Sequence, residues 1–164
     1  MSSYVTRKTP GNTEWFRADR FGMFIHWGIY ALYADHEQVL ARRNLDNASY
    51  ERRMAEFNPV RYDPEEWVKL MKYVCFTAKH HDGFCMWDTR ETAYNIMNTP
   101  YGRDVLKLLS DACRKHGMAL SLYYSNPDWH EPSAYNPLST HQWKSIDPSK
   151  GDSEKYRAFV KAQL

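Results

Sequence analysis

Three short apolar runs, each followed by polar and aromatic residues, limit most strongly what this chain can fold into. They are residues 21–30 (FGMFIHWGIY), 72–79 (KYVCFTAK) and 120–125 (LSLYYS). Nearly continuous apolar runs of this length are typical of strands buried on both faces of a parallel sheet. Patterns typical of helices lie between and after them. The resulting order of strand, helix, strand, helix, strand, helix predicts an α/β fold with parallel strands and right-handed crossovers.

Capping residues and apolar spacing predict the helices. Asp63 suits an N-cap and Pro64 the first position of a helix that runs to Met71. Residues 104–116 carry one apolar stripe at helical spacing, and Gly117 follows where a left-handed C-cap belongs. Further helices are expected at 49–57 and 153–164.

Two parallel-sheet architectures fit this order, the doubly wound sheet and the (β/α)8 TIM barrel. Both place their sites at the carboxyl ends of the strands, where His26, His80-His81 and Tyr123-Tyr124 stand. No GxGxxG or P-loop pattern follows any of the three runs, which weakens a nucleotide-binding interpretation. Long polar loops after each strand favour a barrel. We therefore expect a partial barrel of about three βα units, with residues 1–164 forming a single domain.

Composition argues against several classes of function. The net charge of +2 gives no reason to expect nucleic acid or an anionic membrane as a partner. No apolar run approaches the roughly 18 residues needed to span a bilayer, and residues 1–11 lack the apolar core of a secretory signal. The three cysteines show no CxxC spacing, which is typical of reduced thiols. A cytoplasmic location without a cofactor is expected.

Four segments of the sequence allow a more specific prediction. They are FGMFIHWGIYA, TAKHHDGFCMWDT, YNIMNTPYGRD and LYYSNPDWH. In this order and spacing the chain resembles the N-terminal half of family 29 glycoside hydrolases, the α-L-fucosidases, from Trp15 to Leu164. The resemblance implies a glycosidase that hydrolyses terminal α-L-fucosides with retention, and a fucosylated glycan or L-fucose as its ligand.

The resemblance also implies a substrate site. His26, His80 and His81 would hydrogen-bond fucose hydroxyls, together with Tyr124 and its neighbour Tyr123. Neutral histidine suits a polyol because it donates from one ring nitrogen and accepts at the other. The acid and Trp that line the sugar in the family correspond here to Glu37 and Gln38, so the Trp is missing. The sugar methyl group is expected to contact Trp87, Phe84 or Met86.

Other interpretations of these histidines stay open. A single histidine in an apolar strand, such as His26, is more often a core residue. His80 and His81 could be metal ligands, but no further His or Cys spacing supports zinc, and no metal is expected. Adjacent strand residues point to opposite faces, so both reach one site only if the strand ends there, as Asp82-Gly83 suggests. Structural or surface roles are expected for His36, His116, His130 and His141, and a place at the pocket mouth for Asp128-Trp129.

Retaining glycosidases need two carboxylates about 5–5.5 Å apart. In the family the nucleophile follows the fourth strand, so neither it nor the acid/base is expected within these 164 residues. The available substitutes are Glu37, Asp82, Asp88, Asp128 and Glu131. Three functions therefore stay open: an α-L-fucosidase active in a homo-oligomer or in a longer chain, a non-catalytic fucose-binding module, and an inactive fragment.

One connection departs from the family pattern. The family usually has several residues, including Gly, between the second helix and the second strand, whereas here Met71 runs directly into Lys72. Either the connection is rebuilt or residues are missing from it.

Overall fold

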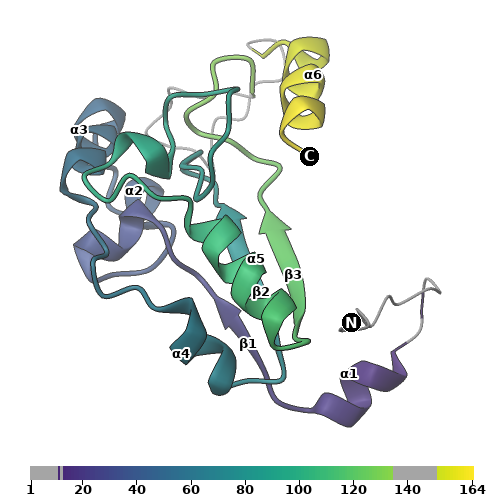
Figure 1. Ribbon diagram of the computed structural model, residues 1–164. Coiled ribbons are helices and arrows are strands. Elements are labelled where there is room, and N and C mark those ends of the chain that lie inside the picture. Colours follow the sequence, from purple (N-terminus) through teal and green to yellow (C-terminus); the bar gives the residue numbers. More distant parts are fainter. Residues whose placement is uncertain (1–10, 12, 135–150) are drawn as a thin grey trace.

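The computed structural model describes residue 11, residues 13–134 and residues 151–164 (Figure 1). At its centre is a parallel sheet in the order β1-β2-β3. The strands are β1 (Gly22–Ile25), β2 (Tyr73–Lys79) and β3 (Ala119–Tyr124). The predicted α/β fold with parallel strands is confirmed.

Helices precede, connect and follow the strands in the expected alternation (Figure 1). Before β1 lies α1 (Glu14–Asp19). Between β1 and β2 lie η1 (Ile29–Tyr33), α2 (Val39–Arg42), α3 (Asn47–Arg52), η2 (Arg53–Glu56) and α4 (Pro64–Lys69). Between β2 and β3 lie η3 (Ile96–Asn98) and α5 (Val105–Lys115), and α6 (Ser153–Gln163) comes last. Among the described residues, no helix is both long and apolar enough to cross a membrane.

The helix ends follow the predicted capping chemistry. The Asp63 carboxylate accepts hydrogen bonds from the backbone N–H groups of Glu65 and Glu66 at the start of α4. The Asp104 carboxylate accepts from the Lys107 N–H at 2.7 Å at the start of α5. Gly117 follows α5 with a φ of +64°, a conformation that favours glycine. The helices expected at 104–116 and 153–164 are confirmed within one residue at each end, whereas the one expected at 49–57 is the helix α3 followed by the 3-10 helix η2, together Asn47 to Glu56.

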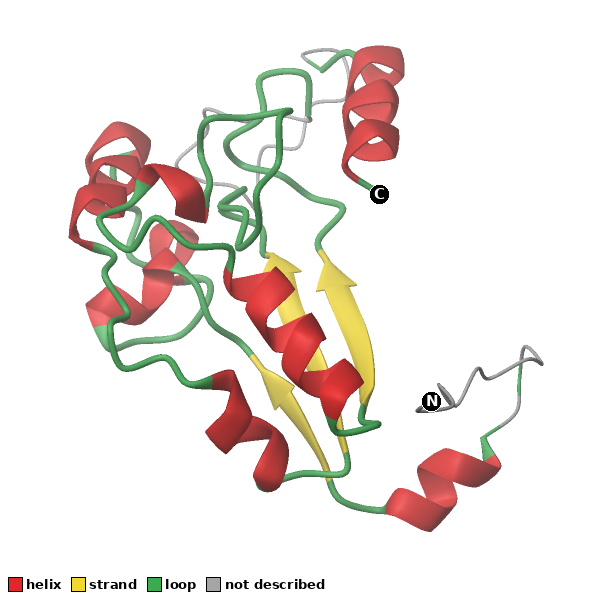
Figure 2. Cartoon of the chain, in the orientation of Figure 1, coloured by secondary structure: helices red, strands yellow, loops and turns green. Residues whose placement is uncertain are grey.

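The two faces of the sheet differ in what covers them. Val74 and Phe76 are buried on the face that packs against α5, which crosses in front of the strands in Figure 2. The opposite face carries Phe24, 48% exposed, and Tyr123, which is half-buried. A doubly wound sheet has helices on both faces, whereas a barrel keeps them on the outside. Among the described residues, the arrangement is that of a barrel segment whose inner face is open.

The expectation that all three strands are buried on both faces is wrong for β1 and β3. The first strand is expected over Phe21–Tyr30 but ends at Ile25, after which the chain turns into η1. Phe24 in β1 is exposed, and so is Leu122 in β3, at 52%. The physical reason is position, because β1 and β3 are the edges of this sheet and only β2 has a strand on both sides.

The short connection before β2 is rebuilt without glycine. The helix α4 ends at Lys69, two residues earlier than predicted, and Leu70 caps it in a right-handed helical conformation. Met71 is buried, and the Lys72 N–H donates to the Phe21 carbonyl oxygen at 2.9 Å. Three residues are therefore enough to bring the chain from the helix to the sheet.

Candidate functional site

The site begins where β2 ends, in the sequence KHHDG. The strand stops at Lys79, so His80 and His81 both lie at its carboxyl end, as expected. The turn that follows is closed by a hydrogen bond from the Gly83 N–H to the His80 carbonyl oxygen at 3.1 Å. Gly83 has a φ of +80°, and a Cβ there would lie 2.6 Å from Oδ1 of Asp128. Only glycine fits this turn, because any side chain would collide with the loop after β3.

Three predicted residues from separate segments meet at this edge of the sheet. His26 follows β1, Glu37 lies between η1 and α2, and His80 follows β2. One potential ligand atom from each lies within 4.8 Å of the other two. His26 is exposed, Glu37 is half-buried, and His80 is only 4% exposed. We call these three residues the histidine–glutamate cluster.

The two tyrosines that end β3 lie on opposite sides of the strand. The ring of Tyr123 stacks on His80 with a centroid separation of 5.6 Å and lies 6.1 Å from the ring of His26. Tyr124 instead donates its hydroxyl hydrogen bond to Oε1 of Gln163 in α6, at 2.6 Å. The structure therefore brings Tyr123 to the cluster. Tyr124, which the resemblance favoured for the sugar, does not lie there.

The remaining predicted aromatics lie away from the cluster or in the core. Trp87 is half-buried, with its ring 6.4 Å from that of Tyr124. Phe84 and Met86 are buried core residues. A contact between any of these three and a sugar methyl group stays a prediction.

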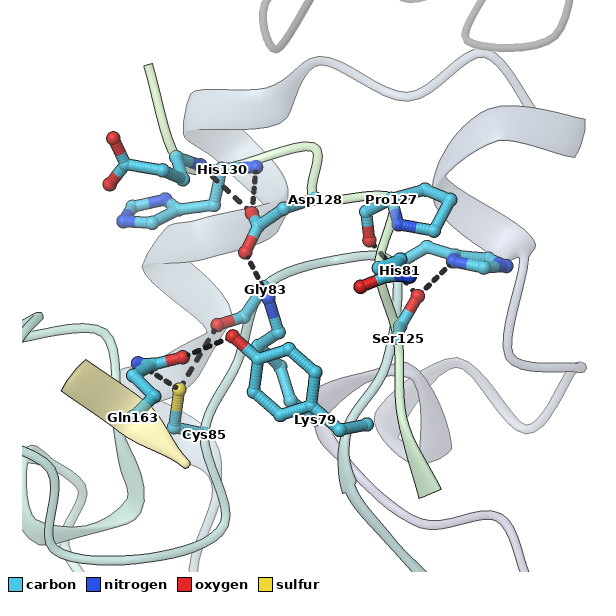
Figure 3. Close-up of polar contacts among 12 residues, drawn as sticks. Lys79, His81, Gly83, Cys85, Ser125, Pro127, Asp128, His130 and Gln163 are labelled. Carbon is cyan, nitrogen blue, oxygen red and sulfur yellow. Dashed lines mark hydrogen bonds and ion pairs between the residues drawn. The ribbon is translucent and has the colours of Figure 1, made fainter. Parts of the chain in front are cut away.

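His81 is held by the loop after β3. Its Nδ1 forms a hydrogen bond with Oγ of Ser125 (Figure 3). Its ring lies 5.3 Å from that of Trp129. Its carbonyl oxygen accepts a hydrogen bond from the Trp129 N–H at 2.7 Å. The ring also lies 4.4 Å from that of His80. Ser125 and Trp129 thus set the position of the second histidine.

Burial decides the protonation of His80. It lowers the pKa of this imidazole to about 3, and the charges of His81 and His26 act in the same direction. The ring is therefore neutral near pH 7 and offers one donor and one acceptor. Its Nδ1 is buried without a hydrogen-bond partner among the described residues. An unsatisfied polar atom of this kind costs about 1–3 kcal/mol, which a hydroxyl of a bound ligand would recover.

Of the three leading carboxylate candidates, two are sealed inside the protein. Asp82 is 2% exposed and accepts a hydrogen bond from the Tyr50 hydroxyl at 2.7 Å. Burial raises the pKa of Asp82 to about 6. Asp128 is 3% exposed and forms an ion pair with Nζ of Lys79 at 2.5 Å (Figure 3). Glu37 is the one of the three that lies at the cluster.

Two other acids were weaker candidates. Asp88 is exposed beside the start of α5, where its N–H donates to the Asp104 carboxylate at 3.0 Å. Glu131 accepts hydrogen bonds from both the N–H and the hydroxyl of Ser133. These contacts give both residues local structural roles.

The other described histidines have the structural or surface contacts that the sequence suggested. Nδ1 of His36 accepts from the Gln38 N–H at 3.0 Å. Nε2 of His116 lies 2.7 Å from a carboxylate oxygen of Glu65 on the surface. His141 lies outside the described residues.

Residues that sequence reasoning missed hold the segment that carries His26. The Thr77 hydroxyl in β2 accepts from the Trp27 N–H at 3.0 Å and lies 3.1 Å from the Ile25 carbonyl oxygen. The Tyr30 hydroxyl lies 3.3 Å from the same oxygen of Thr77. A threonine inside an otherwise apolar strand was the available signal, because a buried hydroxyl needs partners.

We expect the contribution of His130 to stability to depend on pH. Its Nδ1 lies 2.8 Å from Oε1 of Glu51. Burial opposes the charge on His130, but the hydrogen bond and negative charge of Glu51 outweigh it and raise the pKa of the imidazole. A raised pKa stabilises the folded state fully below the unfolded value of about 6.5, and this stabilisation is lost as pH rises through the folded value.

The Glu51→Gln variant should therefore lose more unfolding free energy at about pH 5.5 than at about pH 8, relative to the unaltered protein. Urea denaturation at the two pH values measures the difference. Glu56→Gln is the matched control, since Glu56 pairs with Arg53 at 2.9 Å and arginine does not titrate in this range. An equal loss at both pH values for Glu51→Gln would contradict the assignment.

The alpha-L-fucosidase family profile matches residues 2–164. The chain belongs to the alpha-L-fucosidase family. The resemblance inferred from the four sequence segments is confirmed.

Relatives in this fucosidase family match over most of the chain. Tissue alpha-L-fucosidase of Rattus norvegicus is 31% identical over 141 residues, which cover 73% of this chain and 30% of the rat protein. Alpha-L-fucosidase 1 of Arabidopsis thaliana is 30% identical, over 81% of this chain and 29% of its own. The chain thus spans about 30% of the length of the curated relatives it matches.

Solved fucosidase structures show the same fold. Alpha-L-fucosidase isoenzyme 1 from Paenibacillus thiaminolyticus has a TM-score of 0.82 and 39% identity, over 93% of this chain and 38% of that protein. An alpha-L-fucosidase from Lactobacillus casei, in complex with alpha-L-fucose product, has a TM-score of 0.78 and 28% identity, over 94% of this chain and 57% of its own.

Proposed function

We propose that the histidine–glutamate cluster, with Tyr123 and His81, binds the fucosyl group of a fucosylated glycan. The proposal extends to retaining hydrolysis of terminal α-L-fucosides, to which this chain contributes the sugar-binding half of the site. The observation that carries it is the meeting of His26, Glu37 and His80 within 4.8 Å at the carboxyl edge of a parallel sheet. The unpartnered Nδ1 of His80 offers a polar atom that a sugar hydroxyl would satisfy.

The chemistry of retention sets a further requirement. Two carboxylates must flank the glycosidic bond at about 5–5.5 Å from each other. Asp82 and Asp128 are sealed by burial and by their partners. We propose that Glu37, which lies at the cluster, accepts a hydrogen bond from the sugar. We propose that the reacting carboxylates come from another copy of the chain or from protein beyond these residues. The shared sheet and core support the proposal that residues 1–164 act as one catalytic-barrel domain.

The test combines turnover and binding on the purified chain. Release of nitrophenol from 4-nitrophenyl α-L-fucopyranoside measures hydrolysis, and calorimetric titration with L-fucose measures binding. If turnover is found, NMR detection of the α-anomer as the first product would establish retention. Binding without turnover would identify a fucose-binding module instead. Absence of both would overturn the proposal and leave an inactive fragment.

We further propose that the chain forms a homo-oligomer through its open sheet. Phe21 is 62% exposed, Phe24 48% and Leu122 52%, all on or beside the edge strands. Exposed apolar side chains beside unpaired strand edges favour association. Light scattering should give a mass above that of the 19.5 kDa chain, and Phe24→Ser should lower it. The control Val60→Ser removes an apolar side chain that is 74% exposed but lies away from the sheet. A single-chain mass at all concentrations would contradict the proposal.

A cytoplasmic location is proposed as well. Cys75, Cys85 and Cys113 are free, and burial raises the pKa of the Cys85 thiol to about 12, so it stays protonated and unreactive. Reduced, inert thiols suit a reducing compartment. Fractionation of the producing cells tests the location.

A further inference from the structure

We propose that His26, Glu37 and His80 also bind a divalent transition-metal ion, with Zn²⁺ as the probe, and that the metal competes with the sugar. The competition rests on the proposed function, whereas metal binding itself does not. The described residues form no other group of three histidine, cysteine or acidic side chains close enough to hold an ion.

The composition of the cluster selects the kind of cation. Two imidazoles and one carboxylate form a ligand set that zinc accepts, with water in the fourth position. Imidazole nitrogen suits zinc, copper, nickel and iron, whereas calcium and magnesium prefer oxygen ligands. The cluster therefore favours a late first-row divalent ion over the alkaline-earth ions.

The distances are compatible with coordination after small side-chain movements. Zinc bonds of 2.0–2.1 Å in a tetrahedral site separate the ligand atoms by about 3.3 Å. The ligand atoms of the cluster lie within 4.8 Å of one another, so any pair farther apart than about 3.3 Å must move inward. His26 is exposed and Glu37 is half-buried, and no hydrogen bond to another described residue restrains either side chain. Glu37 can therefore rotate toward a metal, whereas His26 must first leave its edge-to-face contact with the ring of Phe24, whose centroid lies 4.3 Å away.

The third ligand is already fixed. The ring of His80 is packed between Tyr30, at 5.7 Å, and Tyr123, at 5.6 Å. Its buried Nδ1 has no hydrogen-bond partner among the described residues, so the imidazole is not committed to a structural contact. His80 therefore offers an imidazole that packing holds in place, and the other two ligands would complete the metal site by moving toward it.

The same three side chains cannot serve a metal and a sugar together. A coordinated nitrogen or carboxylate oxygen no longer accepts a hydrogen bond from a hydroxyl. Bound Zn²⁺ should therefore weaken the binding of L-fucose, and L-fucose should weaken the binding of Zn²⁺. In cells this competition would make sugar binding sensitive to the free concentration of such metals.

The experiment is calorimetric titration of the full chain with ZnCl₂ in the absence of sugar. One site is expected. His26→Ala and Glu37→Gln should each weaken it by roughly tenfold or more, because even outer-shell changes cost 10–100-fold in metal affinity. The matched control is His116→Ala, which removes an exposed imidazole paired with Glu65 outside the cluster and should leave the affinity unchanged. At a fixed Co²⁺ concentration, the ligand-field absorption of the bound ion should also fall in both cluster variants.

Three outcomes separate the two proposals. Zn²⁺ binding that is absent, or equally strong in the cluster variants, would overturn the metal site whatever the sugar does. Zn²⁺ binding that L-fucose weakens supports both the metal site and the proposed function. If Zn²⁺ binds at the cluster but L-fucose does not bind at all, the metal site stands and the proposed function fails.

Discussion

The Lys79→Met variant is expected to lower the free energy of unfolding by about 3–5 kcal/mol. The side chains of Lys79 and Asp128 are 0% and 1% exposed, and their charged atoms lie 2.5 Å apart. Removing the ammonium leaves a carboxylate buried without its partner, and the low dielectric of the interior makes this costly. Methionine keeps most of the volume of lysine, so the loss measures charge rather than a cavity. Urea denaturation monitored by circular dichroism gives the value.

A second variant separates the ion pair from its neighbours. Oδ1 of Asp128 also accepts hydrogen bonds from the N–H groups of His130, at 2.9 Å, and Glu131, at 2.8 Å. An asparagine in place of this aspartate would keep one oxygen for these bonds. The double variant Lys79→Met/Asp128→Asn should therefore recover much of the stability lost in Lys79→Met. A double variant as unstable as the single one would show that the stranded charge is not the cause.

The His80→Ala variant is expected to weaken L-fucose binding by roughly tenfold to hundredfold, and to lower any turnover in proportion. It removes the buried imidazole on which the ring of Tyr123 stacks. Calorimetric titration with L-fucose measures the change. Circular dichroism must first show a native spectrum, because the substitution also opens a cavity. An unchanged affinity in a folded His80→Ala variant would place the sugar elsewhere.

The two tyrosines provide a matched pair for the same measurement. Tyr123→Phe removes a hydroxyl beside the cluster and should weaken L-fucose binding. Tyr124→Phe removes a hydroxyl that donates to Gln163 and should leave the affinity unchanged. The reverse result would favour the assignment that the family resemblance alone suggested.

Sequence patterns predicted correctly those elements whose capping and packing residues all lie within one short segment. The helix α5 was predicted within one residue at each end because its apolar stripe, the Asp104 cap and Gly117 all lie within one short segment. The extent of β1 was not predicted correctly, because the burial of this strand depends on which strands lie beside it. The side of β3 on which a tyrosine points was not predictable either. The pairing of β2 and β3 shifts register between Thr77 and Lys79, and only the folded sheet contains that information.

The acid that pairs with Lys79 could not be predicted from the sequence either. A lysine at the end of an apolar run needs a buried acid, and the sequence offers several. The acid that pairs with it lies 49 residues later, and the intervening helix and strand decide which acid arrives. The sequence could therefore place the histidines of the cluster at one sheet edge, but not the residues that hold them there.

The segment from Lys79 to Gly83, at the end of β2, contacts the loop after β3 at every second residue. Lys79 pairs with Asp128, Nδ1 of His81 bonds to Ser125, and Gly83 leaves no room beside Asp128 for any larger residue (Figure 3). The two loops therefore form one mechanical unit, and the segment that carries His26 is attached to β2 through Thr77. Changes in the length of the loop after β3 would displace His81, whereas the hydrogen bonds of residues 34–38, around Glu37, stay within residues 31–43. New sugar specificities would thus arise most readily on the side of the site that carries Glu37.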